Sequence, residues 1–267
     1  MPDSQPYRTV AVASTFSPRF AQVLAEAKRV RDRFDCALDL IYVGEKTDET
    51  TAKFREVLGE LSLPLDSTIH YEQGDPADSI LRALTQNKID IIVAGALEKA
   101  VAMHQFLGNV ARRLVREAPC SVILFTHPET EPKPFRKIVF IAVEYTDHTL
   151  NALKKTFHLA LAEKTHCLYV IRVITTFDEA RAKAADQALA ADPEIELEKF
   201  ILSAGHTDVP IEARCIRGNT GFAVADFVQS VEADLLVVPD PPATGPELPA
   251  NLGWLIDVIP CNLWVIR

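Results

Sequence analysis

The sequence has no apolar run of the roughly 18 to 20 residues that a membrane-spanning helix needs, and its first residues lack the apolar core of a signal peptide. It also has only five cysteines in 267 residues, an odd number with no CxxC spacing. This pattern argues against a disulfide framework and against a cysteine zinc site. We therefore expect a cytoplasmic protein with no membrane partner.

Basic residues are fewer than acidic ones, with 28 Lys and Arg against 37 Asp and Glu, which gives a formal net charge of −9. Proteins that bind nucleic acids displace phosphate counterions with a basic surface. We therefore expect no nucleic-acid partner.

Catalytic signatures are missing as well. The sequence has no Gly-x-Ser-x-Gly nucleophile elbow, no Gly-Lys-Ser/Thr phosphate loop and no strand-linked Gly-x-Gly-x-x-Gly. Its seven histidines follow none of the common metal-ligand spacings. We expect no metal site, and we favour a non-catalytic protein over an enzyme.

What the sequence does contain is a duplication. Three landmarks recur in the same order: Gly74 and Gly218, Asp90 and Asp234, Pro119-Cys120 and Pro260-Cys261. Each half alternates short apolar runs with helical patterns, which predicts βαβ crossovers and a parallel sheet. We expect domains at residues 1–127 and 137–267, joined by residues 128–136, a linker stiffened by three prolines.

Two helix starts are indicated by a capping residue followed by proline. Ser17 precedes Pro18 at one start, and Asp75 precedes Pro76 at the other. We expect the glycine turns at Gly74 and Gly218 to be structural in both halves.

Across nearly the whole chain, both halves resemble the universal stress protein family. The resemblance is carried by the Gly-Asp-Pro at Gly74, the apolar run IDIIVAG that ends at Gly95, the Ala-Pro-Cys that ends at Cys120, and the tetrapeptide Phe106-Leu107-Gly108-Asn109. It implies two doubly wound α/β domains, Rossmann-like and similar to adenine nucleotide hydrolases, in one tandem chain. It also implies an intrachain pseudo-dimer, paired through the final strands Ser121–Phe125 and Asn262–Ile266, with homodimerisation as a further option.

The resemblance also implies a ligand cleft in the first domain. Nucleotide-binding members carry Gly-x2-Gly-x9-Gly-Ser/Thr after the fourth strand, and this spacing falls here on Gly95, Glu98, Gly108 and Asn109. Glu98 brings a Cβ atom and a negative charge to a position meant for phosphate. Ser14 stands where those members have an adenine-binding Asp. A retained pocket and a vestigial loop, kept because its turn needs glycine, both fit this pattern.

The corresponding cleft of the second domain would be lined by Glu144, at the position of the family Asp, and by Val173. Its phosphate loop carries five prolines: Pro239, Pro241, Pro242, Pro246 and Pro249. Each proline removes an amide donor, so we expect no triphosphate to bind there.

We therefore predict a non-catalytic cytoplasmic stress-response protein that binds a small ligand or a protein partner. The ligand, AMP, ADP or ATP if it is a nucleotide, would occupy the first domain only, between Ser14, Val43, Gly95, Gly108 and Asn109. A nucleotide with few phosphates suits Glu98 better than ATP does. The alternatives are a weak Mg²⁺-dependent ATP hydrolase and an interaction scaffold without a ligand.

Overall fold

The computed structural model describes residues 5–96, 107–176, 180, 192–240, 253 and 259–267. The chain divides into two compact units, Met1–Lys133 and Pro134–Arg267, and this division falls within the proline-bearing segment 128–136. Among the described residues, no helix is both long and apolar enough to cross a membrane.

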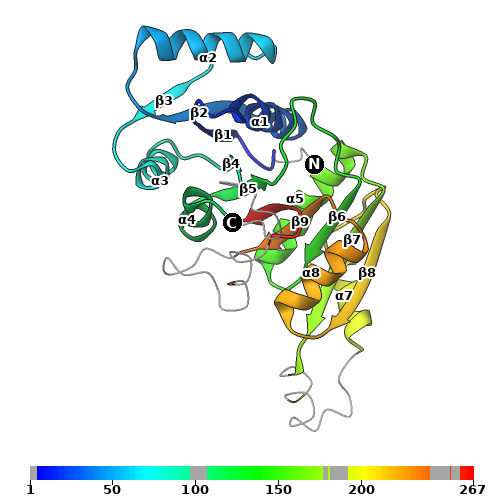
Figure 1. Ribbon diagram of the computed structural model, residues 1–267. Coiled ribbons are helices and arrows are strands. Elements are labelled where there is room, and N and C mark those ends of the chain that lie inside the picture. Colours follow the sequence, from blue (N-terminus) through cyan, green and yellow to red (C-terminus); the bar gives the residue numbers. More distant parts are fainter. Residues whose placement is uncertain (1–4, 97–106, 177–179, 181–191, 241–252, 254–258) are drawn as a thin grey trace. The chain divides into compact units, whose positions relative to one another are not determined.

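Unit 1 is a parallel sheet with helical crossovers (Figure 1). Its elements are β1 (Thr9–Ser14), α1 (Phe20–Phe34), β2 (Ala37–Val43), α2 (Asp48–Glu60), β3 (Ile69–Glu72), α3 (Pro76–Gln86), β4 (Ile91–Gly95), α4 (Asn109–Glu117) and β5 (Ser121–Phe125). The strand order is β3-β2-β1-β4-β5, and every pair is parallel. The order reverses between β1 and β4, where this kind of sheet has its ligand crevice.

Unit 2 repeats this architecture. Its elements are β6 (Lys137–Ile141), α5 (Asp147–Glu163), β7 (Cys167–Ile174), α7 (Pro193–Ser203), β8 (Ile211–Arg217), α8 (Thr220–Ser230), β9 (Leu235–Pro239) and β10 (Asn262–Ile266). The parallel order β8-β7-β6-β9-β10 is the order of unit 1, strand for strand. The prediction of two repeated, doubly wound α/β folds is confirmed.

The core of unit 1 lies on both faces of its central strands. The buried stretches of β1 and β4 are continuously apolar, as expected for strands covered on both sides. Helix α1 packs on β1 and β4, while α3 and α4 pack against each other (Figure 1). Three helices thus surround the carboxyl ends of the two strands at the crevice.

Asp90 and Asp234 perform the same structural task in the two units. Asp90 Oδ2 accepts hydrogen bonds from the backbone amides of Arg8 (2.8 Å) and Thr9 (3.0 Å) at the start of β1. Asp234 Oδ2 accepts from the amides of Arg136 (2.7 Å) and Lys137 (2.8 Å) at the start of β6. The repeat visible in the sequence is therefore a repeat of bonding as well.

One of the two predicted helix starts is correct. Asp75 caps α3 by accepting from the amides of Ala77 and Asp78, with Pro76 at the first helical turn. The Ser17 cap is wrong, because the Ser17 carbonyl closes a tight turn by accepting from the Phe20 amide at 3.0 Å. Pro18 occupies this turn, and α1 begins only at Phe20.

The glycine turns are structural in both units, as predicted. Gly74 has φ +114° and Gly218 has φ +142°, a region that residues with a Cβ atom rarely adopt. Each turn directs the chain into the following helix. The pairing of the units through Ser121–Phe125 and Asn262–Ile266, and homodimerisation, stay predictions.

Candidate functional site

A cavity of about 760 Å³ opens in unit 1 at the carboxyl ends of β1 and β4. Its described lining comes from the strand ends and from the first turns of three helices: Ala13, Ser14, Thr15, Ser17, Pro18, Arg19, Phe20, Val23, Val43, Pro76, Ile80, Ala94, Gly95, Ala96, Val110, Ala111, Phe125 and Pro128. Most of these side chains are apolar. Because the lining includes the ends of β1 and β4, between which the strand order reverses, the cavity lies at the crevice expected for this fold.

The cavity brings together three of the residues expected in the first cleft. Ser14, Val43 and Gly95 all belong to its lining. Gly108 and Asn109 start α4, directly before Val110 and Ala111 of the same lining, and the Gly108 amide donates to the Ala96 carbonyl at 3.0 Å. Glu98 lies outside the described residues.

Backbone strain does not explain the glycines of this loop. Gly108 has φ −60° and ψ 155°, and Gly95 is not among the glycines with positive φ, so both conformations are open to other residues. A Cβ atom added at Gly95 would lie 3.4 Å from Val23 Cγ2. The alternative of a loop kept because its turn needs glycine therefore lacks support at these two positions.

Ser14 combines burial with spare hydrogen-bonding capacity. Its side chain lies at the end of β1 with only 3% of its surface exposed. The hydroxyl donates to the carbonyl of Val12 in its own strand, over a long 3.4 Å. A hydroxyl also has two acceptor lone pairs, so Ser14 can serve a ligand at the floor of the cavity.

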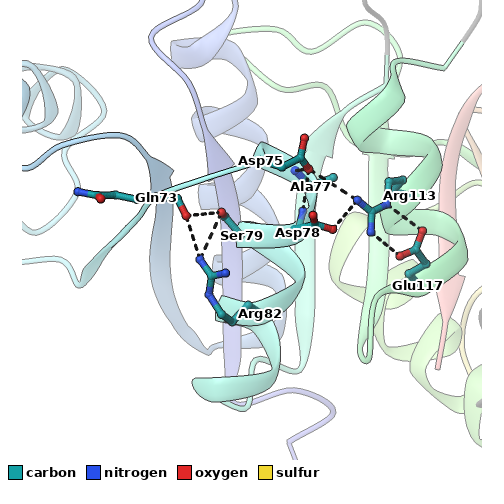
Figure 2. A network of polar contacts seen from close by, with 8 residues as sticks. All are labelled: Gln73, Asp75, Ala77, Asp78, Ser79, Arg82, Arg113 and Glu117. Carbon is teal, nitrogen blue, oxygen red and sulfur yellow. Dashed lines mark hydrogen bonds and ion pairs between the residues drawn. The ribbon is translucent and has the colours of Figure 1, made fainter.

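The walls that α3 and α4 contribute are held together by Arg113 (Figure 2). From α4 its guanidinium donates to Asp78 Oδ1 at the start of α3 (2.6 Å), and to Glu117 on its own helix through Nε (2.9 Å) and Nη2 (2.7 Å). The same guanidinium lies 3.6 Å from Asp75 Oδ1, the cap of α3. Arg113 thus fixes the first turn of α3 beside α4.

The contacts of Arg113 with Asp78 and Glu117, called the Arg113 clamp below, shift the pKa values of two of these groups. The hydrogen bond from Arg113 holds the pKa of Glu117 below its ordinary value of 4.5. Hydrogen bonds to Glu117 and Asp78 raise the pKa of Arg113 in turn. Both groups are therefore charged at neutral pH, and the clamp is intact there.

Sequence reasoning missed Arg19. The expected helix start at Ser17 would have placed Arg19 inside the first turn of α1, whereas the structure places it before the helix, in the cavity lining. The arginine directly after the Ser17-Pro18 pair was the signal in the sequence that could have indicated a charged residue at the cavity. The sequence pattern placed the start of α1 too early, at Ser17, and so assigned this arginine to the helix.

The second cleft differs from the first in register. In unit 1, Val10 of β1 pairs with Ile91 of β4, and in unit 2, Ile138 of β6 pairs with Leu235 of β9. Val10 therefore corresponds to Ile138. Four residues further along, Ser14 corresponds to Ala142, so Glu144 lies two residues beyond that position, exposed in the turn after β6. Val173 lies within β7. Of the five prolines, Pro239 ends β9, and the other four lie outside the described residues.

Unit 2 has a buried ion pair where unit 1 has a small apolar residue. Asp240 is the first residue after β9, as Ala96 is after β4, and both amides donate to the last strand of their unit at 2.9 Å. The Asp240 side chain is 2% exposed and accepts from Arg267, whose side chain is 7% exposed. A charged pair therefore occupies the carboxyl edge of the unit 2 sheet.

Comparison with known proteins identifies one segment of the chain. The profile of the universal stress protein family matches residues 63–126, which include the Gly74 turn, β4, and the start of α4 beside the cavity. This segment is similar to the universal stress protein family. A universal stress protein of Thermus aquaticus is 42% identical over 52 residues, which are 20% of this chain and 38% of that relative. The chain thus spans less than half the length of the relative it matches.

Solved structures extend the likeness in fold to both units. A protein of unknown function from Pseudomonas aeruginosa has a TM-score of 0.74 at 17% identity, with 98% of this chain and 93% of that chain covered. A universal stress protein from Archaeoglobus fulgidus has a TM-score of 0.66 at 14% identity, with 97% and 98% covered. Each unit of this chain therefore has the fold seen in these solved structures.

Proposed function

We propose that the protein is a non-catalytic stress-response protein of the cytoplasm whose unit 1 binds a small ligand, an adenine nucleotide with few phosphates. The observation that carries this proposal is the cavity of about 760 Å³ at the crevice between β1 and β4. Pockets for small molecules commonly have volumes of about 300–1,000 Å³. This volume and this position support a nucleotide as the ligand.

The lining supports a ligand with an aromatic ring and a polar end. Val23, Val43 and Ile80 offer apolar surface to a base, and the Ser14 hydroxyl offers a hydrogen bond at the strand end. The amides in the first turn of α4 have no side-chain cap, and Val110 and Ala111 of this turn line the same cavity as Gly95. Such amides suit an anion.

The restriction to few phosphates rests on the sequence at Glu98. A carboxylate near the phosphate loop repels each further phosphate charge, by about 1 kcal/mol at 4 Å in bulk water and more where water is excluded. AMP should therefore bind at least as well as ATP.

A thermal-shift titration with AMP, ADP and ATP, each with and without Mg²⁺, tests the proposal. A ligand at 100 times its Kd stabilises the folded protein by about 2.7 kcal/mol. We expect AMP to raise the Tm at least as much as ATP does. The cavity-filling variant Val110→Trp should abolish the shift, and Val57→Trp, on α2 and outside the cavity lining, should retain it.

The other results have distinct meanings. A larger shift with ATP, together with phosphate release that requires Mg²⁺, would replace the proposal by a weak ATP hydrolase. Equal shifts in Val110→Trp and wild type would place binding outside the cavity. No shift with any nucleotide would favour an interaction scaffold.

A further inference from the structure

We propose that Arg19 selects an anionic ligand for the unit 1 cavity, with its guanidinium as the counter-charge to a single phosphate, carboxylate or sulfonate group. This inference rests on the proposed function in that both concern the same cavity. It adds a specificity-determining residue and a class of ligand: a compound with an apolar or aromatic body and one anionic group.

The charge in the described lining of the cavity comes from one residue. Among its lining residues that the structure describes, Arg19 is the only one with a charged side chain, and the others are apolar or carry hydroxyl groups. This contrasts with the chain as a whole, which has a formal net charge of −9. A cation beside an apolar cavity, with no carboxylate in the described lining, attracts an anion that the rest of the surface repels.

The Arg19 side chain has no structural partner in the described part of the chain. No hydrogen bond or ion pair involves its guanidinium there, whereas Arg82 binds Glu72 and Arg113 binds Asp78 and Glu117. A guanidinium has five N–H donors. Those of Arg19 are available to a ligand, and a planar fork of donors matches a phosphate or a carboxylate.

The backbone holds Arg19 at the edge of the cavity. Arg19 lies within the turn from Ser17 to Phe20, and its carbonyl accepts from the Val23 amide at 3.1 Å in the first turn of α1. Arg19 is the N-cap of this 15-residue helix, which has no side-chain cap and no acidic residue in its first turn. The positive end of the helix therefore adds to the charge of the guanidinium.

Paired ligands that differ only in the anionic group provide the test. Isothermal titration calorimetry would compare AMP with adenosine on the wild type, Arg19→Gln, Arg19→Lys and Arg8→Gln. Arg8 is a matched control, because it is exposed at the opposite end of β1 and its side chain has no ion pair among the described residues. All variants should keep the wild-type Tm.

We expect Arg19→Gln to weaken AMP binding about tenfold, which corresponds to about 1.4 kcal/mol, and to leave adenosine binding unchanged. Arg19→Lys should lose less, because it retains the charge without the fork of donors. Arg8→Gln should bind both ligands as the wild type does. Equal losses for AMP and adenosine, or no loss for AMP, would overturn the role of Arg19.

A second pair of probes separates failure of this inference from failure of nucleotide binding. If the wild type binds neither AMP nor adenosine, the nucleotide proposal fails, but the charge selection is still measured with anilinonaphthalene sulfonate and the neutral dye N-phenylnaphthylamine. Arg19→Gln should reduce the fluorescence titration of the sulfonate and leave that of the neutral dye unchanged. Identical titrations of both dyes in wild type and variant would refute the inference.

Discussion

The buried carboxylate of Asp240 accepts two hydrogen bonds from the guanidinium of Arg267, at 3.1 Å from Nε and 2.7 Å from Nη2. Both bonds go to Oδ2, and Oδ1 has no hydrogen-bond partner within the described part of the chain. When one member of such a pair is removed, a charge stays buried without compensation. Because Asp240 follows β9 and Arg267 follows β10, the pair links the ends of these two strands in unit 2.

Arg267→Met should lower the free energy of unfolding by about 3–5 kcal/mol, because Asp240 would remain buried and unpaired. Urea unfolding followed by circular dichroism measures this loss. The double variant Asp240→Asn/Arg267→Met should recover part of the stability, since it also removes the stranded charge. A double variant that is less stable than Arg267→Met would show that charge compensation is not the reason.

Arg113→Gln should lower the Tm at pH 7 and weaken ligand binding, because it releases α3 from α4 at the wall of the cavity. The effect on stability should depend on pH through Glu117. Its pKa is held below the ordinary 4.5 in the folded protein, so the stabilisation is present above that value and is lost as the pH falls further and Glu117 is protonated.

Thermal unfolding of both proteins between pH 3 and pH 7 would check this dependence. The Tm difference between wild type and Arg113→Gln should shrink below about pH 4.5. Arg8→Gln, an exposed arginine with no ion pair among the described residues, is the control. A Tm difference that stays constant over the whole range would contradict the role of the Glu117 carboxylate.

Gly74→Ala and Gly95→Ala should differ in what they impair. Gly74 has φ +114°, so a Cβ atom there should cost about 1–3 kcal/mol of stability. Gly95→Ala should change stability by less than about 0.5 kcal/mol and reduce the Tm shift with AMP, because the new methyl group lies beside Val23 in the cavity. Equal destabilisation by the two variants would argue against this division of roles.

Cys36 and Cys261 should react slowly at pH 8. Burial raises the pKa of Cys36 to about 11 and that of Cys261 to about 12, from an ordinary value of 9.0. Only the thiolate reacts, and at pH 8 about one Cys36 thiol in a thousand is ionised. Labelling with iodoacetamide, read by peptide mass spectrometry, should accelerate as the pH rises toward 11. Labelling at pH 8 as fast as that of free cysteine would contradict the shift.

Local patterns sufficed for several features of the fold and the site. The Asp75-Pro76 start of α3 was predictable because a cap and its amides lie within three residues of one another. Ser14 and Gly95 could be placed together because parallel strands present their carboxyl ends at one edge of a sheet. The start of α1 was not predictable in this way, because the Ser-Pro pair also fits the turn that it forms.

The sequence by itself determined the duplication, the parallel sheets and the turns at Gly74 and Gly218, because repeated apolar periodicity and glycine conformations are properties of neighbouring residues. Only the tertiary structure decided that Ala142 corresponds to Ser14, that Arg19 lines the cavity, and that Asp240 pairs with Arg267. These relations depend on strand register and on contacts between segments distant in the chain. No local pattern encodes such register and contacts.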